Sequence, residues 1–245
     1  TSIPPGGTDE YDCAVILHVL RDGQRTEHTL SRVFGVSTYG ETSIPATHTG
    51  TMYDVLPACC ANRSGDVFVS ALEIAPTPPF GWTGSEQATM RLWHEAGGIV
   101  TDLSHLVADP DPALRFKVVP NAWDGPILAV CIVYKPHPTI YGRSEIPTRF
   151  ITLRRVDGEI VGTTCTGQLI DTLPNAALHD RHMLCGPTLY LNNPAGGVSR
   201  LLAIDTQDGI VTGNAVSGGT VGVDVRFATN GRRTYIVGRD EAKLI

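Results

Sequence analysis

Residues 149–170 read RFITLRRVDGEIVGTTCTGQLI, and this stretch decides the fold class. Two short runs rich in Ile, Val, Leu and Thr flank the turn signal Val156-Asp157-Gly158. Runs of strand length and this composition, bounded by Gly and Asp, predict β-strands. The stretch therefore predicts two strands joined by a tight turn.

The same pattern continues through the rest of the chain. Further turn signals stand at RDG (21–23), QDG (207–209) and TNG (229–231). Helical periodicity never extends beyond a few turns, and DLSHLVAD (102–109) predicts one short helix or a loop. The fold class is therefore predicted to be all-β. The other strand-length runs are 13–20, 32–40, 66–75, 88–93, 126–134, 187–191, 199–206, 220–228 and 233–238.

The strand-like runs are interrupted by a stretch rich in Pro and Asp, DPDPALRFKVVPNAWDGP, residues 109–126. Its density of Pro and Asp is typical of a linker between domains. Each side of it holds about six strand candidates, a number that fits an antiparallel barrel. We therefore expect two six-stranded antiparallel β-barrels, one in residues 1–112 and one in residues 113–245.

Composition limits the classes of function. Acidic residues exceed basic ones, 25 against 19, and the net charge of −6 gives no general nucleic-acid-binding surface. The six cysteines form no CxxC pair and no repeated spacing, so neither a zinc site nor a disulfide scaffold is expected. This indicates reduced thiols in an intracellular protein. No run is long enough to span a bilayer, and a secretory leader is not expected. A start at Thr1 fits a piece excised from a longer precursor, as it would fit a shortened chain.

Three polar residues stand in the order that cysteine proteolysis requires. The reaction needs a thiolate, a base and a group that orients the base. His48 follows Ile44-Pro45, Glu86 precedes a strand-like run, and Cys185 stands before Gly186-Pro187. Asp66, Glu95 and above all Asp102 are alternatives to Glu86 as the acid. Cys165, which lies within a β-branched run, is interpreted as a core thiol.

These motifs resemble those of the picornavirus-type chymotrypsin-like cysteine proteases, the picornain family. IPATH (44–48) is similar to the stretch that carries the family's base, and Cys185-Gly186 to the second half of its G-x-C-G motif. Glu86, with Asp102-Leu103 downstream, is similar to the strand that carries its acid. AIDTQDGIVTGNA (203–215) aligns with its later substrate-binding strands.

The resemblance implies an active site in the cleft between two barrels. Cys185 would attack the peptide, His48 would be the base, and Glu86 would orient His48. Backbone N–H groups of Met183, Leu184 and Cys185 would bind the oxyanion. Neither a metal nor a cofactor is implied. The substrate would be a viral polyprotein, including the enzyme's own flanks, in the cytoplasm of the host cell.

Departures from the family pattern concern the substrate pocket. Asp205 stands where the family has a histidine that recognises glutamine, and Asp180 where it usually has a threonine. Because carboxylates accept hydrogen bonds only, this favours Lys or Arg before the cleaved bond. The alternative is that His179 or His182 supplies the donor and keeps glutamine. Gly213 aligns with the family's second pocket strand. Met183 replaces the first glycine of G-x-C-G, and Pro187 replaces a small residue.

Three other functions have less support in the sequence. His94 and His105, with nearby carboxylates, lack the spacing of a metal site. The family's RNA-binding face tends to carry a basic residue before its acid turn, where this chain has Ile99-Val100-Thr101, so RNA binding is not expected there. The rival class is a β-rich virus coat protein of the jelly-roll kind, which would have no catalysis. The sequence leaves the oligomeric state open.

Overall fold

The computed structural model consists mainly of antiparallel strands, which confirms the all-β prediction. Contacts divide the chain into two compact units, Thr1–Cys59 with Val69–Pro112, and Cys60–Phe68 with Ala113–Ile245. The structure describes residues 8–39, 45–50, 52–53, 57–75, 87–111, 114–139, 142–165, 182–195, 198–207, 211–214, 226–230, 233–237 and 242–244.

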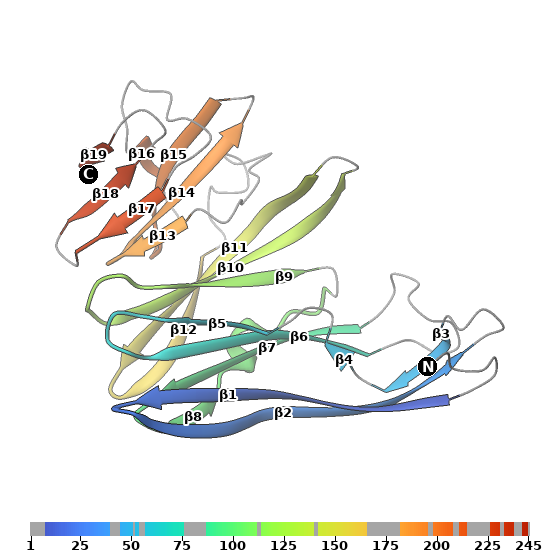
Figure 1. The fold of residues 1–245 in the computed structure, drawn as a ribbon. Helices are drawn as coiled ribbons and strands as arrows, with labels where there is room; N and C mark the ends of the chain where they lie inside the picture. Colours follow the sequence, from blue (N-terminus) through green and yellow to red (C-terminus); the bar gives the residue numbers. More distant parts are fainter. Residues whose placement is uncertain are drawn as a thin grey trace. The chain divides into compact units, whose positions relative to one another are not determined.

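The described residues of the first unit lie mainly in two sheets (Figure 1). One sheet has the order β1-β2-β3, and the other has the order β4-β6-β7-β8 with β5 paired to β6. Strands β5 and β6 each contribute residues to both units. The strands are β1 (Thr8–Arg21), β2 (Gln24–Tyr39), β3 (Pro45–Gly50), β4 (Met52–Tyr53), β5 (Ala58–Ala61), β6 (Val67–Ala75), β7 (Gln87–Ala96) and β8 (Ile99–Asp102).

The hairpin of β1 and β2 follows directly from its sequence. Asp22 and Gly23 have φ values of +49° and +76°, and positive φ at both positions is what a two-residue type I′ turn needs. Along β1, Val15, Leu17 and Val19 are buried, whereas the residues between them face solvent. Period-two alternation of this kind fixes the register, because a slip by one residue would expose the apolar face.

The second unit contains three sheets within the described ranges. Their orders are β12-β11-β10-β9, β13-β14-β15-β16 and β17-β18-β19. Asp157 and Gly158, with φ values of +50° and +89°, turn the chain from β11 to β12. The strands are β9 (Arg115–Pro120), β10 (Ile127–Thr139), β11 (Gly142–Val156), β12 (Glu159–Cys165), β13 (His182–Cys185), β14 (Thr188–Ala195), β15 (Val198–Asp205), β16 (Val211–Asn214), β17 (Arg226–Thr229), β18 (Thr234–Val237) and β19 (Ala242–Leu244).

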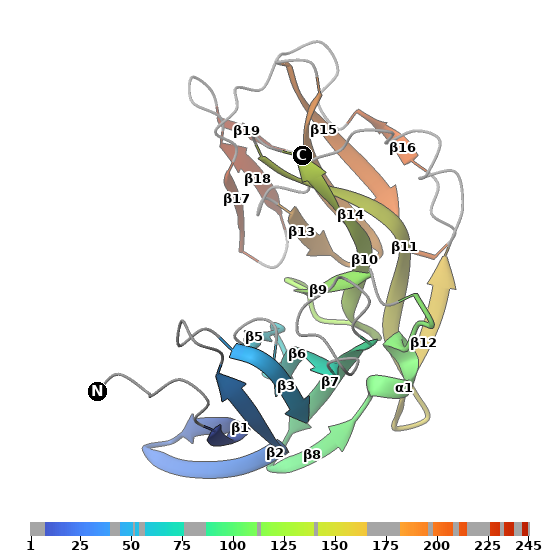
Figure 2. The same ribbon diagram turned by 90° about the vertical axis from the view of Figure 1, so that its right-hand side faces the viewer.

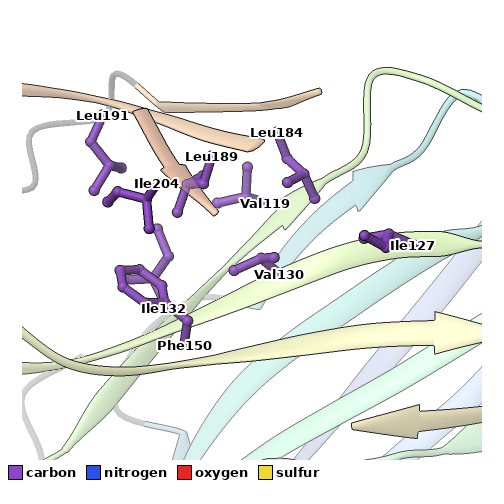
Figure 3. Packing of buried hydrophobic residues seen from close by; sticks show 9 residues of the cluster. All are labelled: Val119, Ile127, Val130, Ile132, Phe150, Leu184, Leu189, Leu191 and Ile204. Atoms are coloured by element: carbon purple, nitrogen blue, oxygen red, sulfur yellow. The ribbon is translucent and has the colours of Figure 1, made fainter. Parts of the chain in front are cut away.

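Apolar side chains from two of these sheets share one core (Figure 3). Strands β9, β10 and β11 supply one side of it, and β13, β14 and β15 supply the other. The second unit is therefore a sheet-on-sheet packing, held mainly by burial of aliphatic surface. The members are Val119, Ile127, Val130, Ile132, Phe150, Leu184, Leu189, Leu191 and Ile204.

Several finer expectations differ from the structure. No closed barrel is found among the residues described. The expected linker contains strand β9, because its alternating RFKVVP run pairs with β10 despite the flanking prolines. The only helix of the described part is α1 (Ser104–Val107), visible in Figure 2. Among the described residues, no helix is long and apolar enough to cross a membrane.

Candidate functional site

Cys185 is the last residue of β13 and stands directly before a two-residue hairpin turn. Gly186 and Pro187 form this turn, and Cys185 pairs with Thr188 across it. Gly186 has φ of +58°, whereas proline is fixed near −65°. A type I′ turn would need positive φ at both residues, so this is a type II′ turn with glycine first. The Cys185 side chain is thereby held at the tip of a rigid hairpin.

Asn121 anchors the turn from outside the hairpin. Its Nδ2 donates to the carbonyl oxygens of Ile127, at 2.8 Å, and Gly186, at 3.2 Å. Its Oδ1 accepts from the N–H groups of Gly186 and Trp123, each at 3.0 Å. The amide of Asn121 is 1% exposed and uses both donors and both acceptor sites. The backbone beside Cys185 is therefore fixed by a fully bonded buried amide.

The sheet β13–β16 brings distant residues onto one face. Cys185 lies opposite Thr188, and Thr188 lies opposite Asp205 on the next strand. Residues directly opposite in antiparallel strands share a face, so Cys185 and Asp205 flank Thr188 on the same side of the sheet. The next row on this face is Met183, Tyr190, Ala203 and Gly213.

Backbone polar groups beside the thiol are engaged by neighbouring segments. The carbonyl oxygen of Leu184 accepts from the N–H of Ala122 at 2.9 Å, outside the hairpin. Because successive residues of a strand point their polar groups to alternate sides, Met183 and Cys185 direct theirs at β14. Their N–H groups thus lie within the hairpin ladder instead of facing a substrate. The predicted oxyanion hole stays a prediction, and it requires these groups to leave the ladder.

A hollow of about 460 Å³ lies beside β13 within the second unit. His182 and Met183 form part of its wall, next to Cys185 in the chain. Its volume lies in the range of ligand pockets, and its wall combines apolar and polar groups. The lining residues are Ala61, Asn62, Arg63, Val119, Pro120, Asn121, Ala122, His182, Met183 and Thr229.

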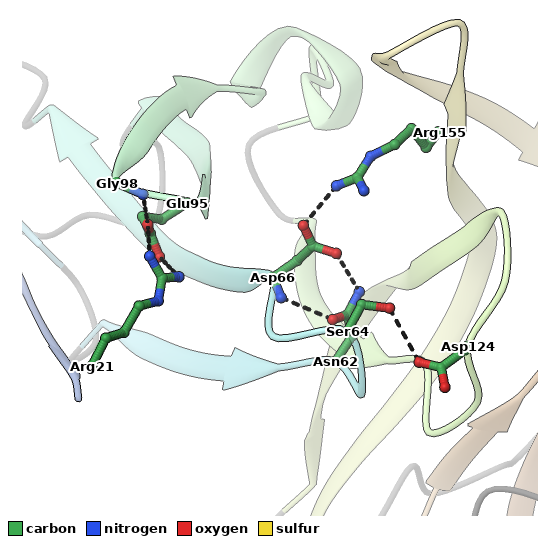
Figure 4. A network of polar contacts seen from close by, with 8 residues as sticks. All are labelled: Arg21, Asn62, Ser64, Asp66, Glu95, Gly98, Asp124 and Arg155. Carbon is green, nitrogen blue, oxygen red and sulfur yellow. Dashed lines mark hydrogen bonds and ion pairs between the residues drawn. The ribbon is translucent and has the colours of Figure 1, made fainter.

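The turn that carries Asn62 and Arg63 is held by a buried acid. Asp66 is 4% exposed, and its Oδ1 accepts from Arg155 Nη2 at 2.6 Å (Figure 4). Asn62 Nδ2 donates to Asp66 Oδ2, and the Asp66 N–H donates to Asn62 Oδ1, both at 2.9 Å. Asp66, one alternative for the triad acid, is thus committed to positioning one wall of the hollow.

A second buried acid lies in the first unit. Glu95 is 1% exposed and accepts two hydrogen bonds from Arg21, at 2.8 and 2.7 Å (Figure 4). The Gly98 N–H also donates to Glu95, at 2.7 Å. Asp102, the leading alternative acid, is exposed and accepts from the Ser104 N–H at 2.8 Å. Of these two alternatives, Asp102 keeps the more open carboxylate.

The other predicted site residues fall in different parts of the chain. His48 lies on β3 in the first unit, opposite Ser37, whereas Cys185 belongs to the second unit. Glu86 and Asp180 lie outside the described residues. His182 is half-buried on β13. The joint action of His48, Glu86 and Cys185 therefore stays a prediction.

The sequence motifs do not point to two residues of this region. Asn121 stood inside the expected linker, where an Asn before Trp-Asp-Gly is typical of any turn. Tyr190 stood in an apolar run, where its position opposite Met183 depends on the hairpin register. The predicted turn after Cys185 was a sufficient signal for Tyr190, because it fixes that register. Cys165, interpreted as a core thiol, is indeed buried.

The chain matches no family model, no curated protein and no solved structure. The resemblance to picornavirus-type proteases therefore depends on the sequence motifs.

Proposed function

We propose that the protein is a cysteine endopeptidase that cleaves a viral polyprotein in the host cytoplasm. Cys185 is the nucleophile, His48 is the base and Glu86 orients it, on two chymotrypsin-like barrels. The observation that supports the proposal is the strand register around Cys185. This register places Cys185 beside the turn of a hairpin. Across the sheet, Thr188 on β14 lies between Cys185 on β13 and Asp205 on β15.

The proposed reaction needs only side chains and water. His48 takes the thiol proton, and the Cys185 sulfur bonds to the scissile carbonyl carbon while the carbonyl electron pair moves to oxygen. When the oxyanion collapses, the carbon–nitrogen bond breaks and His48 returns the proton to the leaving amine. Water then hydrolyses the thioester, which releases the acid and restores the thiol. No metal or cofactor takes part in these steps.

Specificity for a basic residue is part of the proposal. Asp205 is half-buried, and its Oδ1 accepts from the Gln207 N–H at 2.8 Å, which orients the carboxylate. A carboxylate on the same sheet face as the thiol matches a Lys or Arg side chain. A peptide library profiled with the enzyme and with Asp205→Asn tests this. Strict cleavage after glutamine in both proteins would contradict it.

The central test compares two buried cysteines at strand ends. Cys185→Ala is expected to abolish cleavage of a fluorogenic peptide library, because it removes the nucleophile. Cys165→Ala removes a thiol that is 6% exposed at the end of β12, and it is expected to keep activity. His48→Ala is expected to lose activity like Cys185→Ala. Full activity in Cys185→Ala would refute the proposal.

One observation favours a second candidate, the non-enzymatic jelly-roll coat protein. Cys185 is 4% exposed, and burial of this degree is ordinary for a core thiol. In that case a peptidyl chloromethyl ketone would label Cys185 no faster than free chloroacetamide does. As a peptidase, the protein would react with the peptidyl reagent at least tenfold faster, and His48→Ala would remove that advantage.

A further inference from the structure

Attack by Cys185 on a carbonyl would create a negative oxygen that needs hydrogen-bond donors. Such donors are worth about 10²–10³ in kcat each. The Gly186 N–H donates to Asn121, and the polar groups of Met183 and Cys185 point at β14. These three N–H groups are therefore engaged while the hairpin is closed, and a side chain is another source of a donor.

Tyr190 is placed to supply such a donor. It lies directly opposite Met183 and so shares a face with Met183 and Cys185. Cys185 is its diagonal neighbour, within the reach of an aromatic side chain. The opposite face of the hairpin is occupied by the core residues Leu184 and Leu189. Tyr190 is half-buried, and its phenol carries one O–H donor.

Electrostatics link the two side chains. Burial, and then negative charge on Cys185, raises the pKa of Tyr190 above its ordinary value of 10.0. The phenol therefore keeps its proton at neutral pH, including in the presence of a Cys185 thiolate. A neutral phenol close enough to interact with this sulfur is suited to donate to the negative oxygen of the carbonyl that the sulfur attacks.

We propose that the Tyr190 hydroxyl donates the hydrogen bond that stabilises the oxyanion formed by attack of Cys185. The inference rests on the proposed peptidase function. When the sulfur–carbon bond forms, the carbonyl electron pair moves to oxygen, and Tyr190 donates to that oxygen without losing its proton. When the carbon–nitrogen bond breaks, the pair returns to the carbonyl and the hydrogen bond weakens.

Tyr190→Phe removes only the donor oxygen and is the principal variant. Tyr134→Phe is the matched control, because Tyr134 is also a partly buried tyrosine of the second unit. We expect kcat to fall about 10²–10³-fold in Tyr190→Phe with KM within twofold. Tyr134→Phe is expected to keep wild-type kcat. Tyr190→His retains a ring N–H and is expected to keep at least tenfold more kcat than Tyr190→Phe.

Two inhibitors separate an oxyanion donor from a structural role. A peptide aldehyde forms a tetrahedral adduct with the thiol and is expected to bind Tyr190→Phe about 100-fold more weakly. Chloroacetamide alkylates the thiol without forming an oxyanion, so its rate is expected to be unchanged. Loss of both reactions would show a structural role and overturn the inference, as would unchanged kcat in Tyr190→Phe.

The outcomes also separate this inference from the proposed function. Loss of cleavage in Cys185→Ala with full cleavage in Tyr190→Phe overturns the Tyr190 role alone. Full cleavage in Cys185→Ala overturns the peptidase itself.

Discussion

Asn121 joins three segments of the second unit through its buried side-chain amide and its backbone. Its side chain bonds to Gly186 and to Trp123, and its carbonyl oxygen accepts from the Arg63 N–H at 3.1 Å. Its own N–H donates to Leu128 at 2.9 Å. Because each bond involves a buried group, loss of the side chain would leave several partners unsatisfied. The shape of the hollow and the position of Cys185 therefore depend on the same residue.

Gly186 should resist substitution for a backbone reason. At φ of +58° an added Cβ costs about 1–2 kcal/mol. Its nearest neighbour, in the Trp123 side chain, would be at an ordinary contact distance of 3.6 Å. We expect Gly186→Ala to lower the free energy of unfolding by about that amount in urea. Gly125→Ala is the control, because Gly125 has no positive φ and no atom within 4 Å of the added Cβ. Equal effects of the two substitutions would contradict this reasoning.

Cys131 should make stability fall at alkaline pH. Burial, and then negative charge on Cys60, raises its pKa far above the ordinary value of 9.0. Above pH 9 the unfolded chain loses this proton while the folded protein keeps it, so stability is lost as pH rises. The expected contribution is about 1.4 kcal/mol per pH unit. Urea titrations between pH 8 and 11 should show a smaller slope in Cys131→Ala, and parallel curves for the two proteins would refute it.

At the scale of elements, strands are predicted best where turn residues and the spacing of apolar residues indicate the same boundary. The turns at Asp22-Gly23 and Asp157-Gly158 were predicted, and both form hairpins with positive φ. The strand after the first turn was predicted only from residue 32, whereas β2 already begins at Gln24. Strand β9 was missed because its prolines indicate a linker, while its pairing with β10 depends on a partner further along the chain. Cys185 was expected in a turn and is the last strand residue before it. Local sequence therefore predicts the turns and most strands, whereas the pairing of a strand such as β9 depends on a segment elsewhere in the chain.

The β11–β12 hairpin is fastened at its tip by Arg155. Arg155 bonds to Asp66 at 2.6 Å, and removing it would leave a buried carboxylate without its cation. We expect Arg155→Met to cost about 2–4 kcal/mol, measured by urea unfolding. Arg63→Met is the control, because Arg63 and its partner Asp124 are 47% and 67% exposed. Exposed pairs contribute about 0–1 kcal/mol. A larger loss in Arg63→Met than in Arg155→Met would contradict the assignment.

At the scale of the whole molecule, the chain passes between its two units more than once. The sequence predicted a single boundary after residue 112, whereas the contacts assign Cys60–Phe68 to the second unit. The assignment of this segment to the second unit could not be predicted, because its partners lie far along the chain. Arg63 bonds to Asn121, and Asp66 bonds to Arg155. The triad prediction has the same limit, since His48 and Cys185 belong to different units.

Because Cys60–Phe68 belongs to the second unit, the behaviour of chain fragments can be predicted. Residues 113–245 alone lack the segment that pairs Asp66 with Arg155 and that lines the hollow with Asn62 and Arg63. We expect this fragment to show no cooperative thermal transition by circular dichroism. Addition of a peptide of residues 57–75 should restore one, and a scrambled peptide should not. A cooperative transition in the fragment alone, at the temperature of the full chain, would contradict the assignment.

The bond between Asp66 and Arg155 also has a consequence during synthesis. The two residues are separated by 89 positions. At elongation rates of about 5–20 residues per second, Asp66 leaves the ribosome about 4–18 s before Arg155 does. In that interval Val69–Pro112, which completes the first unit, emerges. The later residues that contact Cys60–Phe68 in the second unit are not yet available. The pace of translation therefore sets how long Asp66 remains without this ion pair.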